Sequence, residues 1–377
     1  MKVLYVTYQA VMYGANTSLF YLMKDMRKRH NVTPVLLVSE EGPLVDLCQK
    51  EGIKVYCLPF YRWLTIGNSS LAHVKSVYKN ILNSRNYRLV LSKLKDEQFD
   101  LVHTNSTITD IGDNIANYYG VPHIWHLREY GIDDYNMFFS HNNKYVRKRF
   151  NRSEHIVAIS ESIKECYVQE RKLCDSNKVT VIYNGVDIPE KYTKNWYDKT
   201  RKLNICMSGM ISSNKNQIMA IEACNSLKKI TGNFTLHIIG DGVTSYVDEL
   251  KEKVRQYNLE NNVEFWGYRK DVIEILKQMD LGLMLSKKEA FGRVTVEFML
   301  NYMPVIGADS GGTTELIKSG ENGFLCRLDD VASLVQSLSE FEKNPMLIRT
   351  MGENARKIAE SKYGKEINTD NIYKLYC

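Results

Sequence analysis

The sequence predicts an α/β protein made of two doubly wound domains. Short apolar segments typical of buried parallel strands alternate with longer helical segments, as in βαβ units. The alternation is interrupted by the polar stretch KYTKNWYDKTRK and starts again at LNICMSGMI. A chain of 377 residues is long enough for two domains of ordinary size.

The first half of the chain contains six strand patterns before it reaches an Asn-Gly turn. In order, they are KVLYVTY, TPVLLVS, KVYCLPF, FDLVHTN, VPHIWHLRE and EHIVAIS. We expect helices from about Thr17 to Arg29, in GPLVDLCQKEG, over residues 69–96 as one or two segments, and in ITDIGDNIANYYG. The series ends at VTVIYNGVD, so we assign residues 1–184 to an N-terminal domain.

The second half repeats the alternation with new strand patterns. These are LNICMSGMI, TLHIIGDG, VEFWGY, LGLMLS, PVIGADSGG and GFLCRL. Each is followed by a loop or a helix pattern, which predicts a C-terminal domain over residues 185–355. The remaining residues, 356–377, are predicted to form one amphipathic helix that crosses back to the N-terminal domain.

Composition and cysteine usage are typical of a cytoplasmic globular protein. The hydrophobic fraction is 44% and the charged fraction 25%. No apolar run approaches the roughly 20 residues of a spanning helix. The first residues enter a strand pattern directly, without the features of a signal peptide. The eight cysteines form no CxxC pair, so we expect reduced, packed thiols rather than disulfides or a zinc site.

Part of the net charge of +6 lies in two basic runs. The runs are Lys24, Arg27, Lys28, Arg29 and, later, Lys144, Arg147, Lys148, Arg149, Arg152. Each run is either a solvated helix end or a surface that attracts anionic lipid headgroups or phosphorylated substrates. The second alternative implies peripheral contact with the inner face of the plasma membrane. No motif with interleaved aromatic residues predicts a nucleic-acid partner.

The stretch SKKEAFGRVTVEFML carries the strongest chemical signal. It follows a predicted strand, and ligands of open α/β sheets bind at the carboxyl ends of strands. Gly292 permits close approach of the backbone to a ligand, and the helix that starts there offers free N–H groups to a phosphate. Glu289 and Glu297 are suited to accept hydrogen bonds from the paired hydroxyls of sugars. The alternative is a charged turn with a surface Arg293–Glu297 ion pair.

The segment EAFGRVTVEFMLNYMPVIGADSGGTTELI resembles the signature of the retaining glycosyltransferases of family 4, which have the GT-B fold. Glu289 and Glu297 match the two glutamates of that signature. Further resemblances follow in the family's order in IVAISESIKE, VIYNGVD, MSGMISSNKNQIMAIEA, IIGDG and VEFWGYRKDV. The resemblance implies two Rossmann-like domains that face each other across a cleft. The N-terminal domain would bind the acceptor and the C-terminal domain the nucleotide-sugar.

The resemblance also implies roles for individual donor-binding residues. Glu289 would hold hydroxyls of the donor sugar, helped by backbone N–H groups around Phe291 and Gly292. Glu297 would bind the ribose, and Lys215 would neutralise the diphosphate. The remaining matched donor-binding positions are Gly14 in a loop that closes over the phosphate, Gly209, Val294, and Tyr268 and Arg269 near the base.

Histidines and acids at other strand ends have less specific signals. His126, in IWHLREY, matches the family histidine near the reaction centre, and His103 also ends a predicted strand. Asp241 belongs to a turn in IIGDG, which is not a dinucleotide fingerprint. Asp133 and Asp134, in GIDDYN, could suggest a metal, but two acids in a polar loop are usually only that, and the resemblance implies a metal-independent enzyme.

One departure from the family pattern concerns the donor diphosphate. Met210 stands where the family usually has an arginine, and Arg293 stands where an apolar residue is more usual. A guanidinium binds phosphate oxygens in a forked geometry, so we expect Arg293 to supply the missing charge. The alternatives are weak or altered donor binding, or an Arg293 that only pairs with Glu297.

The predicted function is a retaining transfer of a hexose or N-acetylhexosamine. The donor would be a nucleotide-sugar, a UDP-sugar by preference, and the acceptor a glycan on a lipid carrier in bacterial surface polysaccharide or glycolipid synthesis. Catalysis is assigned to His126, Lys215, Glu289 and Arg293, without a metal or cofactor. The alternatives are a sugar-nucleotide epimerase of the same fold and a non-catalytic nucleotide- or glycan-binding relative.

Overall fold

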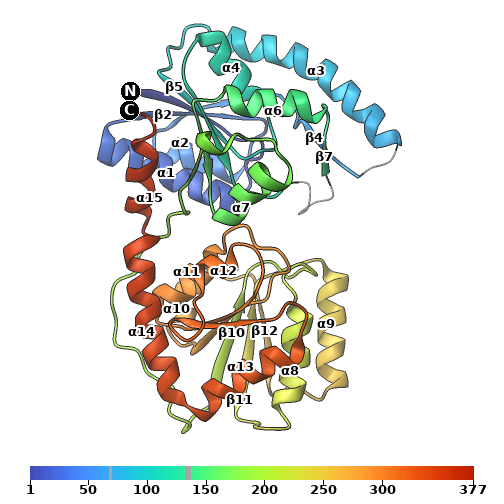
Figure 1. Cartoon of the computed structure of the whole chain (residues 1–377), viewed down its shortest axis with the longest axis vertical. Coiled ribbons are helices and arrows are strands. Elements are labelled where there is room, and N and C mark those ends of the chain that lie inside the picture. Colours follow the sequence, from blue (N-terminus) through green and yellow to red (C-terminus); the bar gives the residue numbers. More distant parts are fainter. Residues whose placement is uncertain (68–69, 132–136) are drawn as a thin grey trace. The chain divides into compact units, whose positions relative to one another are not determined.

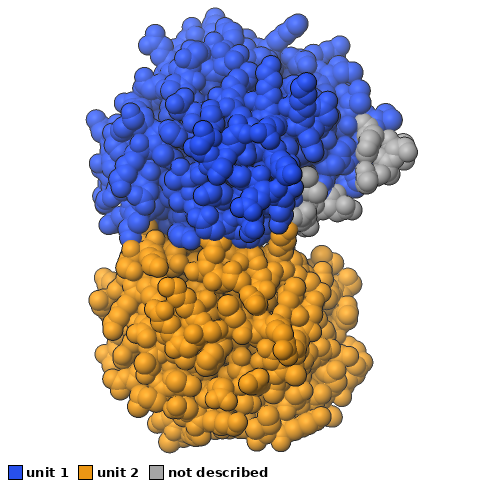
Figure 2. All heavy atoms as spheres, in the orientation of Figure 1, with its two compact units in different colours: residues 1–185, 365–377 blue, residues 186–364 orange. Residues whose placement is uncertain are grey.

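The computed structural model describes residues 1–67, 70–131 and 137–377. Figure 1 shows its helices and strands, and Figure 2 its two compact units. Unit 1 comprises residues 1–185 and 365–377, and unit 2 comprises residues 186–364. The acid pair Asp133 and Asp134 lies outside the described residues.

Unit 1 is built on a seven-stranded sheet in which every pair of neighbouring strands is parallel. In spatial order the strands are β3 (Lys54–Cys57), β2 (Thr33–Val38), β1 (Lys2–Val6), β5 (Leu101–Asn105), β6 (His123–Leu127), β8 (His155–Ala158) and β9 (Val179–Val181). The chain runs outward from β1 to β3 and then returns to add strands on the other side. The direction of winding therefore switches between β1 and β5, and such switch points are where open α/β sheets bind ligands.

Helices cover both faces of this sheet, because its strands alternate apolar side chains between two cores. Val3 and Tyr5 of β1 lie in one cluster, and Leu4 and Val6 lie in the other. The helices of unit 1 are α1 (Gly14–His30), α2 (Pro43–Lys50), α3 (Ser70–Leu94), α4 (Ile111–Tyr119), α6 (Asn143–Arg152), α7 (Glu161–Glu165) and α15 (Lys365–Tyr373), with short turns over Cys166–Glu170 and Ser176–Lys178. The helices predicted for this half of the chain are thus present, and the region predicted as one or two helices contains the single helix α3.

A small antiparallel sheet in unit 1 was absent from the sequence-based prediction. It pairs β4 (Leu64–Ile66) with β7 (Met137–Phe139). Each strand is only three residues long, too short for an alternation pattern to stand out. Trp63, directly before β4, is fully buried and stacks on Trp125 with ring centroids 5.5 Å apart.

The C-terminal segment differs from the single predicted helix over 356–377. The chain instead forms α14 (Pro345–Lys362) in unit 2 and α15 in unit 1, with the change of unit between Gly364 and Lys365. Ile372 and Tyr376 are buried in the same core cluster as α1. A Cβ on Gly185 would lie 2.5 Å from the Cα of Lys365, so glycine is required where the chain leaves unit 1.

Unit 2 repeats the architecture with a six-stranded parallel sheet. In spatial order the strands are β12 (Val263–Gly267), β11 (Phe234–Ile239), β10 (Leu203–Ser208), β13 (Leu281–Met284), β14 (Val305–Ala308) and β15 (Gly323–Cys326). The helices are α8 (Gln217–Leu227), α9 (Thr244–Gln256), α10 (Val272–Leu276), α11 (Arg293–Leu300), α12 (Thr313–Leu316), α13 (Val331–Lys343) and α14. Here the direction of winding switches between β10 and β13.

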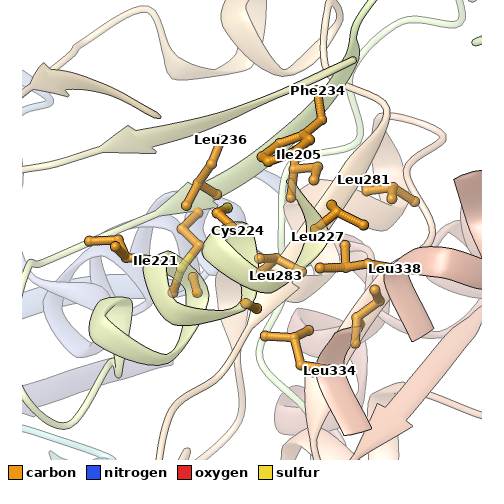
Figure 3. Packing of buried hydrophobic residues seen from close by; sticks show 14 of the residues in the cluster. Ile205, Ile221, Cys224, Leu227, Phe234, Leu236, Leu281, Leu283, Leu334 and Leu338 are labelled. Carbon is orange, nitrogen blue, oxygen red and sulfur yellow. The ribbon is translucent and has the colours of Figure 1, made fainter. Parts of the chain in front are cut away.

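The core of unit 2 fixes the helices that carry the site. Figure 3 shows Ile205 and Leu281 from neighbouring strands packed with Leu227 of α8 and Leu338 of α13. On β13, a Cβ at Gly282 would lie 2.3 Å from the ring of Phe298, so this glycine lets α11 pack directly on the strand.

Two further predictions concern cysteines and membrane spans. All eight cysteines are free thiols, and six of them are buried, as expected for packing residues. Within the described ranges, no helix combines the length and apolarity that crossing a bilayer requires.

Candidate functional site

Three neighbouring strands of unit 2 end in glycines at the carboxyl edge of the sheet. Gly209 and Gly240 follow β10 and β11, and Gly267 is the last residue of β12; their φ angles of 125°, 141° and 64° are disfavoured for residues with side chains. A Cβ on Gly240 would lie 1.9 Å from the carbonyl oxygen of Gly209. By contrast, apart from the adjacent residues of the chain, no described residue has an atom within 4 Å of the Cβ position of Gly209. The backbone of this predicted donor-binding residue therefore borders open space.

Lys215 and Glu289 form an ion pair at the switch point of unit 2. The Lys215 Nζ lies 2.5 Å from the Glu289 Oε2, and the side chains are 27% and 17% exposed. Lys215 comes from the loop after β10 and Glu289 from the loop after β13, and these two strands are neighbours in the sheet. The structure thus brings together two predicted catalytic residues that are far apart in the sequence.

Gly292 sets the start of α11 beside this pair. Its φ of 92° is in the left-handed region, and a Cβ there would lie 3.5 Å from the Glu289 Cγ. The backbone N–H of Gly312 donates to the carbonyl of Glu289 over 2.7 Å, which ties the loop to the start of α12. The side chain of Phe291 is buried against Tyr363, so its predicted role must be carried by its backbone.

Arg293 and Glu297 lie on the same face of α11, as predicted. The Arg293 Nε donates to the Glu297 Oε1 over 3.0 Å, and each side chain is only about one-fifth exposed. Burial raises the pKa of Glu297, and the neighbouring guanidinium partly offsets that shift. The pair is therefore partly enclosed rather than a freely solvated surface bridge. Val294 follows in the first turn of the helix, and its predicted contact with the donor stays a prediction.

Tyr268 and Arg269, the residues predicted near the base, lie apart from the Lys215–Glu289 pair. Arg269 donates twice to Asp271, over 2.8 and 2.6 Å, and lies over the ring of Trp266. Tyr268 is 72% exposed and Met210 is 58% exposed. Among the described residues, no hydrogen bond or ion pair joins these side chains to Lys215 or Glu289. The predicted base site is thus a separate, exposed part of the same sheet edge.

A second group of polar residues gathers at the switch point of unit 1. An open cavity of about 120 Å³ lies there, lined by residues that include Tyr8, Tyr13, Asn16, Ser106 and Glu129. The Asn16 amide donates to the carbonyls of Gln9 and Val11, each over 2.8 Å, which fixes the loop between β1 and α1. Gly14, the predicted loop glycine, begins α1 between the cavity residues Tyr13 and Ala15, and beyond these neighbours no described residue lies within 4 Å of its Cβ position.

Glu129 is held at the wall of this cavity by three donors. Its Oε1 accepts from the Ser106 hydroxyl over 2.8 Å, the Thr107 N–H over 2.6 Å and the Thr107 hydroxyl over 2.5 Å. Glu129 follows His126 by three residues in IWHLREY, and no separate role was predicted for it. Its fixed carboxylate makes it a candidate to face polar ligands in the cavity.

His126 is buried at the end of β6 in a chain of hydrogen bonds. Its Nδ1 lies 3.1 Å from the Nε2 of His103, whose Nδ1 lies 2.7 Å from the hydroxyl of Tyr376. Burial lowers the pKa of both histidines well below the usual value, and the Arg128 cation lowers it further. Both rings are therefore neutral at physiological pH.

The neighbouring arginine decides which nitrogen of His126 carries the hydrogen. Arg128 can only donate, and its Nη2 lies 3.4 Å from the Nδ1 of His126, so we assign that nitrogen as the acceptor. The hydrogen of the neutral ring is then on Nε2, which is buried and has no partner among the described residues. The Nε2–H of His126 is therefore a hydrogen-bond donor that no described residue uses. In the same scheme His103 donates from its Nε2, and its Nδ1 takes the hydrogen of the Tyr376 hydroxyl at 2.7 Å in place of the longer contact of 3.2 Å between Tyr376 and the Tyr5 hydroxyl.

Arg128 is itself positioned by two amides from distant parts of the chain. It donates to the side-chain oxygens of Asn105 and Asn184, the latter over 2.5 Å. Sequence reasoning missed the roles of Asn105, Asn184 and Tyr376, because they come from three separate segments. Asn184 carried one signal, since it stands in the Asn-Gly turn that marked the domain boundary.

The structure also bears on whether a metal could be bound. In the parts of the chain that the structure describes, no three His, Cys, Asp or Glu residues converge in such a group.

The sequence matches two family models that together span most of the chain. Residues 12–190 match the model described as Glycosyltransferase Family 4, and residues 190–358 match Glycosyl transferases group 1. Two relatives illustrate the similarity. One is UDP-Gal:alpha-D-GlcNAc-diphosphoundecaprenol alpha-1,3-galactosyltransferase of Escherichia coli, 26% identical over 90% of this chain and 88% of the relative. The other is N-acetyl-alpha-D-glucosaminyl L-malate synthase of Bacillus anthracis, 28% identical over 62% of each chain, which is under two thirds of that enzyme's length.

The fold is also that of solved structures. HepE of Anabaena, solved in complex with UDP, superposes with a TM-score of 0.80 over 99% of both chains, at 22% identity. A glycosyltransferase from Rickettsia africae superposes with a TM-score of 0.79 over 100% of this chain and 97% of the other, at 19% identity. The predicted fold class, GT-B with two Rossmann-like domains, is confirmed. By its two family models, the chain belongs to the glycosyltransferases, Family 4 in its first half and group 1 in its second.

Proposed function

We propose that this glycosyltransferase moves a hexose or N-acetylhexosamine from a UDP-sugar to a glycan on a lipid carrier, with retention of configuration. The observation that carries the proposal is the Lys215–Glu289 pair at the switch point of unit 2, beside the start of α11. The Escherichia coli relative, by its name, uses a UDP-sugar and a diphosphoundecaprenol-linked acceptor. That name supports both substrate classes for a bacterial surface glycan.

Donor binding would use the charges of unit 2 in a defined exchange. The diphosphate would take Lys215 away from Glu289, because its two negative charges together attract the ammonium more strongly than one carboxylate does. Glu289 would then be released to accept hydrogen bonds from sugar hydroxyls. Glu297 would accept from the ribose, and the N–H groups at Gly292 and Arg293 would face the phosphates.

The chemical step would rely on electrostatic stabilisation. The acceptor oxygen attacks the anomeric carbon from the face that the diphosphate leaves, and the leaving phosphate takes the acceptor proton. The new glycosidic bond forms as the bond from the anomeric carbon to the phosphate oxygen breaks. Lys215 and Arg293 would stabilise the charge that develops on the diphosphate, so we propose no metal and no cofactor. His126, with its hydrogen on Nε2, would donate to a substrate oxygen.

The comparisons fit a transferase, and they fit neither the epimerase nor the non-catalytic relative. Met210 is the one feature that favours a non-catalytic relative, because it removes a cation that the family uses at the diphosphate.

The test is transfer from UDP-glucose, UDP-galactose and UDP-N-acetylglucosamine to a short-chain polyprenyl-diphosphate sugar, followed by NMR. We expect an α-linked product, activity that survives EDTA, and loss of activity in Glu289→Gln. A β-linked product would contradict retention, and activity lost in EDTA but restored by Mg²⁺ or Mn²⁺ would contradict metal independence. No transfer from any donor, with intact folding, would contradict the proposal itself.

A further inference from the structure

Helix α3 of unit 1 has an unusual charge composition. It contains five basic residues and no acidic one, and no Asp or Glu occurs anywhere between Glu51 and Asp96. Acids make up 44 of the 377 residues, so an acid-free stretch of this length departs clearly from the rest of the chain. Figure 1 shows α3 at the periphery of unit 1. This helix therefore presents a surface of one sign of charge.

The first half of α3 also exposes a row of apolar side chains. Val74, Val77, Tyr78 and Ile81 are 67%, 59%, 63% and 55% exposed. They are spaced at i, i+3, i+4 and i+7, so they share one face of the helix. We call these four residues the apolar row. Contiguous exposed apolar patches on globular domains usually mark sites of interaction.

Basic residues border and continue the apolar row. Lys75 lies beside Val74 and Tyr78, and Arg85 and Arg88 are exposed further along the same side of the helix. The pKa of Lys79 is lowered, first by burial and then by the cations of Arg62 and Lys75. Among the residues that the structure describes, no acidic group contributes to that shift, and none forms an ion pair with Lys75, Arg85 or Arg88.

The two basic runs singled out in the sequence behave differently. In α1, Lys24 pairs with Glu51 and Arg29 with Asp370, each over 2.7 Å. Two of the four cations in the first run are thus paired with acids of unit 1.

Three of the five cations in the second run are paired in the same way. Arg149 and Arg152 of α6 both pair with Asp113, and Arg147 pairs with Asp175. The runs chosen for their charge density are therefore poorer candidates for an anionic surface than α3.

We propose that α3 docks the protein onto an anionic lipid bilayer. The apolar row would enter the headgroup region, while Lys75, Arg85 and Arg88 would contact lipid phosphates with their apolar stems laid along the surface. A second copy of the chain fits poorly, because it would place two acid-free helices against each other. This inference rests on the proposed function in one respect: an acceptor on a lipid carrier is found at such a surface.

Binding to vesicles tests the proposal without measuring turnover. The full chain is floated with vesicles of phosphatidylcholine alone or with one third phosphatidylglycerol, at low and high salt. We expect binding only to the anionic vesicles and weaker binding at high salt. The triple variant Lys75→Gln, Arg85→Gln, Arg88→Gln should bind roughly 100-fold more weakly, at about fivefold per basic residue. The pair Val77→Ser, Ile81→Ser should lose roughly tenfold or more.

Matched variants separate α3 from generic effects. Lys28→Gln, Lys144→Gln, Lys148→Gln removes the same charge from the two basic runs, and Ile230→Ser, Met346→Ser removes equally exposed apolar side chains from unit 2. Both control variants should bind like the unchanged protein, and all variants should keep its thermal unfolding and its donor turnover.

Three results would overturn the proposal. They are no binding of the unchanged protein to anionic vesicles, an equal loss in the lysine control, and a dimer in sedimentation equilibrium that Val77→Ser, Ile81→Ser dissociates. The last result would assign a second copy to α3. The two tests are independent. Absence of the proposed transfer reaction would not affect the vesicle-binding result, and absence of vesicle binding would not affect the measured donor turnover.

Discussion

At the scale of single residues, the ion pair between Arg293 and Glu297 is the point on which two interpretations diverge. The structure pairs the two side chains in a partly enclosed position. That geometry fits an arginine that only pairs with Glu297. The same arginine, however, begins α11, and the free N–H groups of a helix N-terminus can bind a phosphate. The function of Arg293 is therefore decided by kinetics.

The variant Arg293→Leu is expected to lower turnover by on the order of 10²-fold, because contacts to a leaving group count most in the transition state. Adding Met210→Arg should recover part of the loss, since a cation then returns to the family position. Steady-state rates of the four combinations measure both effects. Near-normal turnover in Arg293→Leu would reduce the residue to a structural partner of Glu297.

The two glutamates should differ in which ligand they affect. Glu297→Ala should weaken UDP and the UDP-sugar alike, because both carry the ribose. Glu289→Ala should weaken the UDP-sugar and spare UDP, because its proposed partner is the sugar. Each loss should be roughly 1.5–3 kcal/mol, measured by calorimetric titration. Equal effects of both variants on both ligands would show that the assignments are wrong.

Tyr376 is expected to position His126 from the far end of the chain. Tyr376→Phe removes the hydroxyl 2.7 Å from the Nδ1 of His103, and we expect kcat to fall about fivefold while UDP binding is unchanged. Tyr373→Phe, at the end of α15 and three residues before Tyr376, is the control and should leave kcat unchanged. If both variants change only thermal stability, the chain of hydrogen bonds has no part in turnover.

At the scale of elements, β5 and β6 hold three buried histidines that the sequence marked only in part. His103, His123 and His126 all have pKa values lowered mainly by burial, that of His123 to about 3. His123 is held by Thr104 and Ser153, each hydroxyl within 2.8 Å of a ring nitrogen. These neutral rings are part of the packing between neighbouring strands.

The stability of unit 1 should therefore fall as the pH falls through the unfolded histidine pKa of about 6.5. Below that pH the unfolded chain binds protons that the native rings do not, so protonation favours unfolding. Between pH 7.5 and 5.5 the three rings together should cost up to about 4 kcal/mol, at about 1.4 each. Urea unfolding followed by the fluorescence of Trp63 and Trp125 measures this. Equal or greater stability at pH 5.5 would contradict neutral burial.

The sequence predicted most elements because their signals are local. Each strand of the two parallel sheets is a short apolar run, and the motif from Glu289 to Glu297 lies in one continuous loop and helix. The β4–β7 pair was missed because its strands are too short to show a pattern. The break between α14 and α15 was missed because an amphipathic pattern does not reveal which unit each turn packs against.

At the scale of the whole molecule, the two sheets share one design with different chemistry at their switch points. Unit 2 gathers glycines, a lysine and carboxylates from adjacent loops, and a family pattern in the sequence already joined them. Unit 1 gathers His126, Arg128 and Tyr376 from β6 and the C-terminus, and only folding brings these together. Sequence reasoning therefore located the proposed donor-binding residues of unit 2 far better than the polar residues that gather in unit 1.

The measurement that tests the account most directly is UDP binding to the carboxyl edge of the unit 2 sheet. Calorimetric titration compares the unchanged protein with Lys215→Gln and with Lys202→Gln, which removes a lysine from the opposite edge at the start of β10. We predict that Lys215→Gln weakens UDP by roughly 10- to 100-fold, as expected for a lost charged hydrogen bond, and that Lys202→Gln leaves it unchanged. Equal affinity in all three proteins, or no UDP binding in any of them, would contradict a diphosphate site at Lys215.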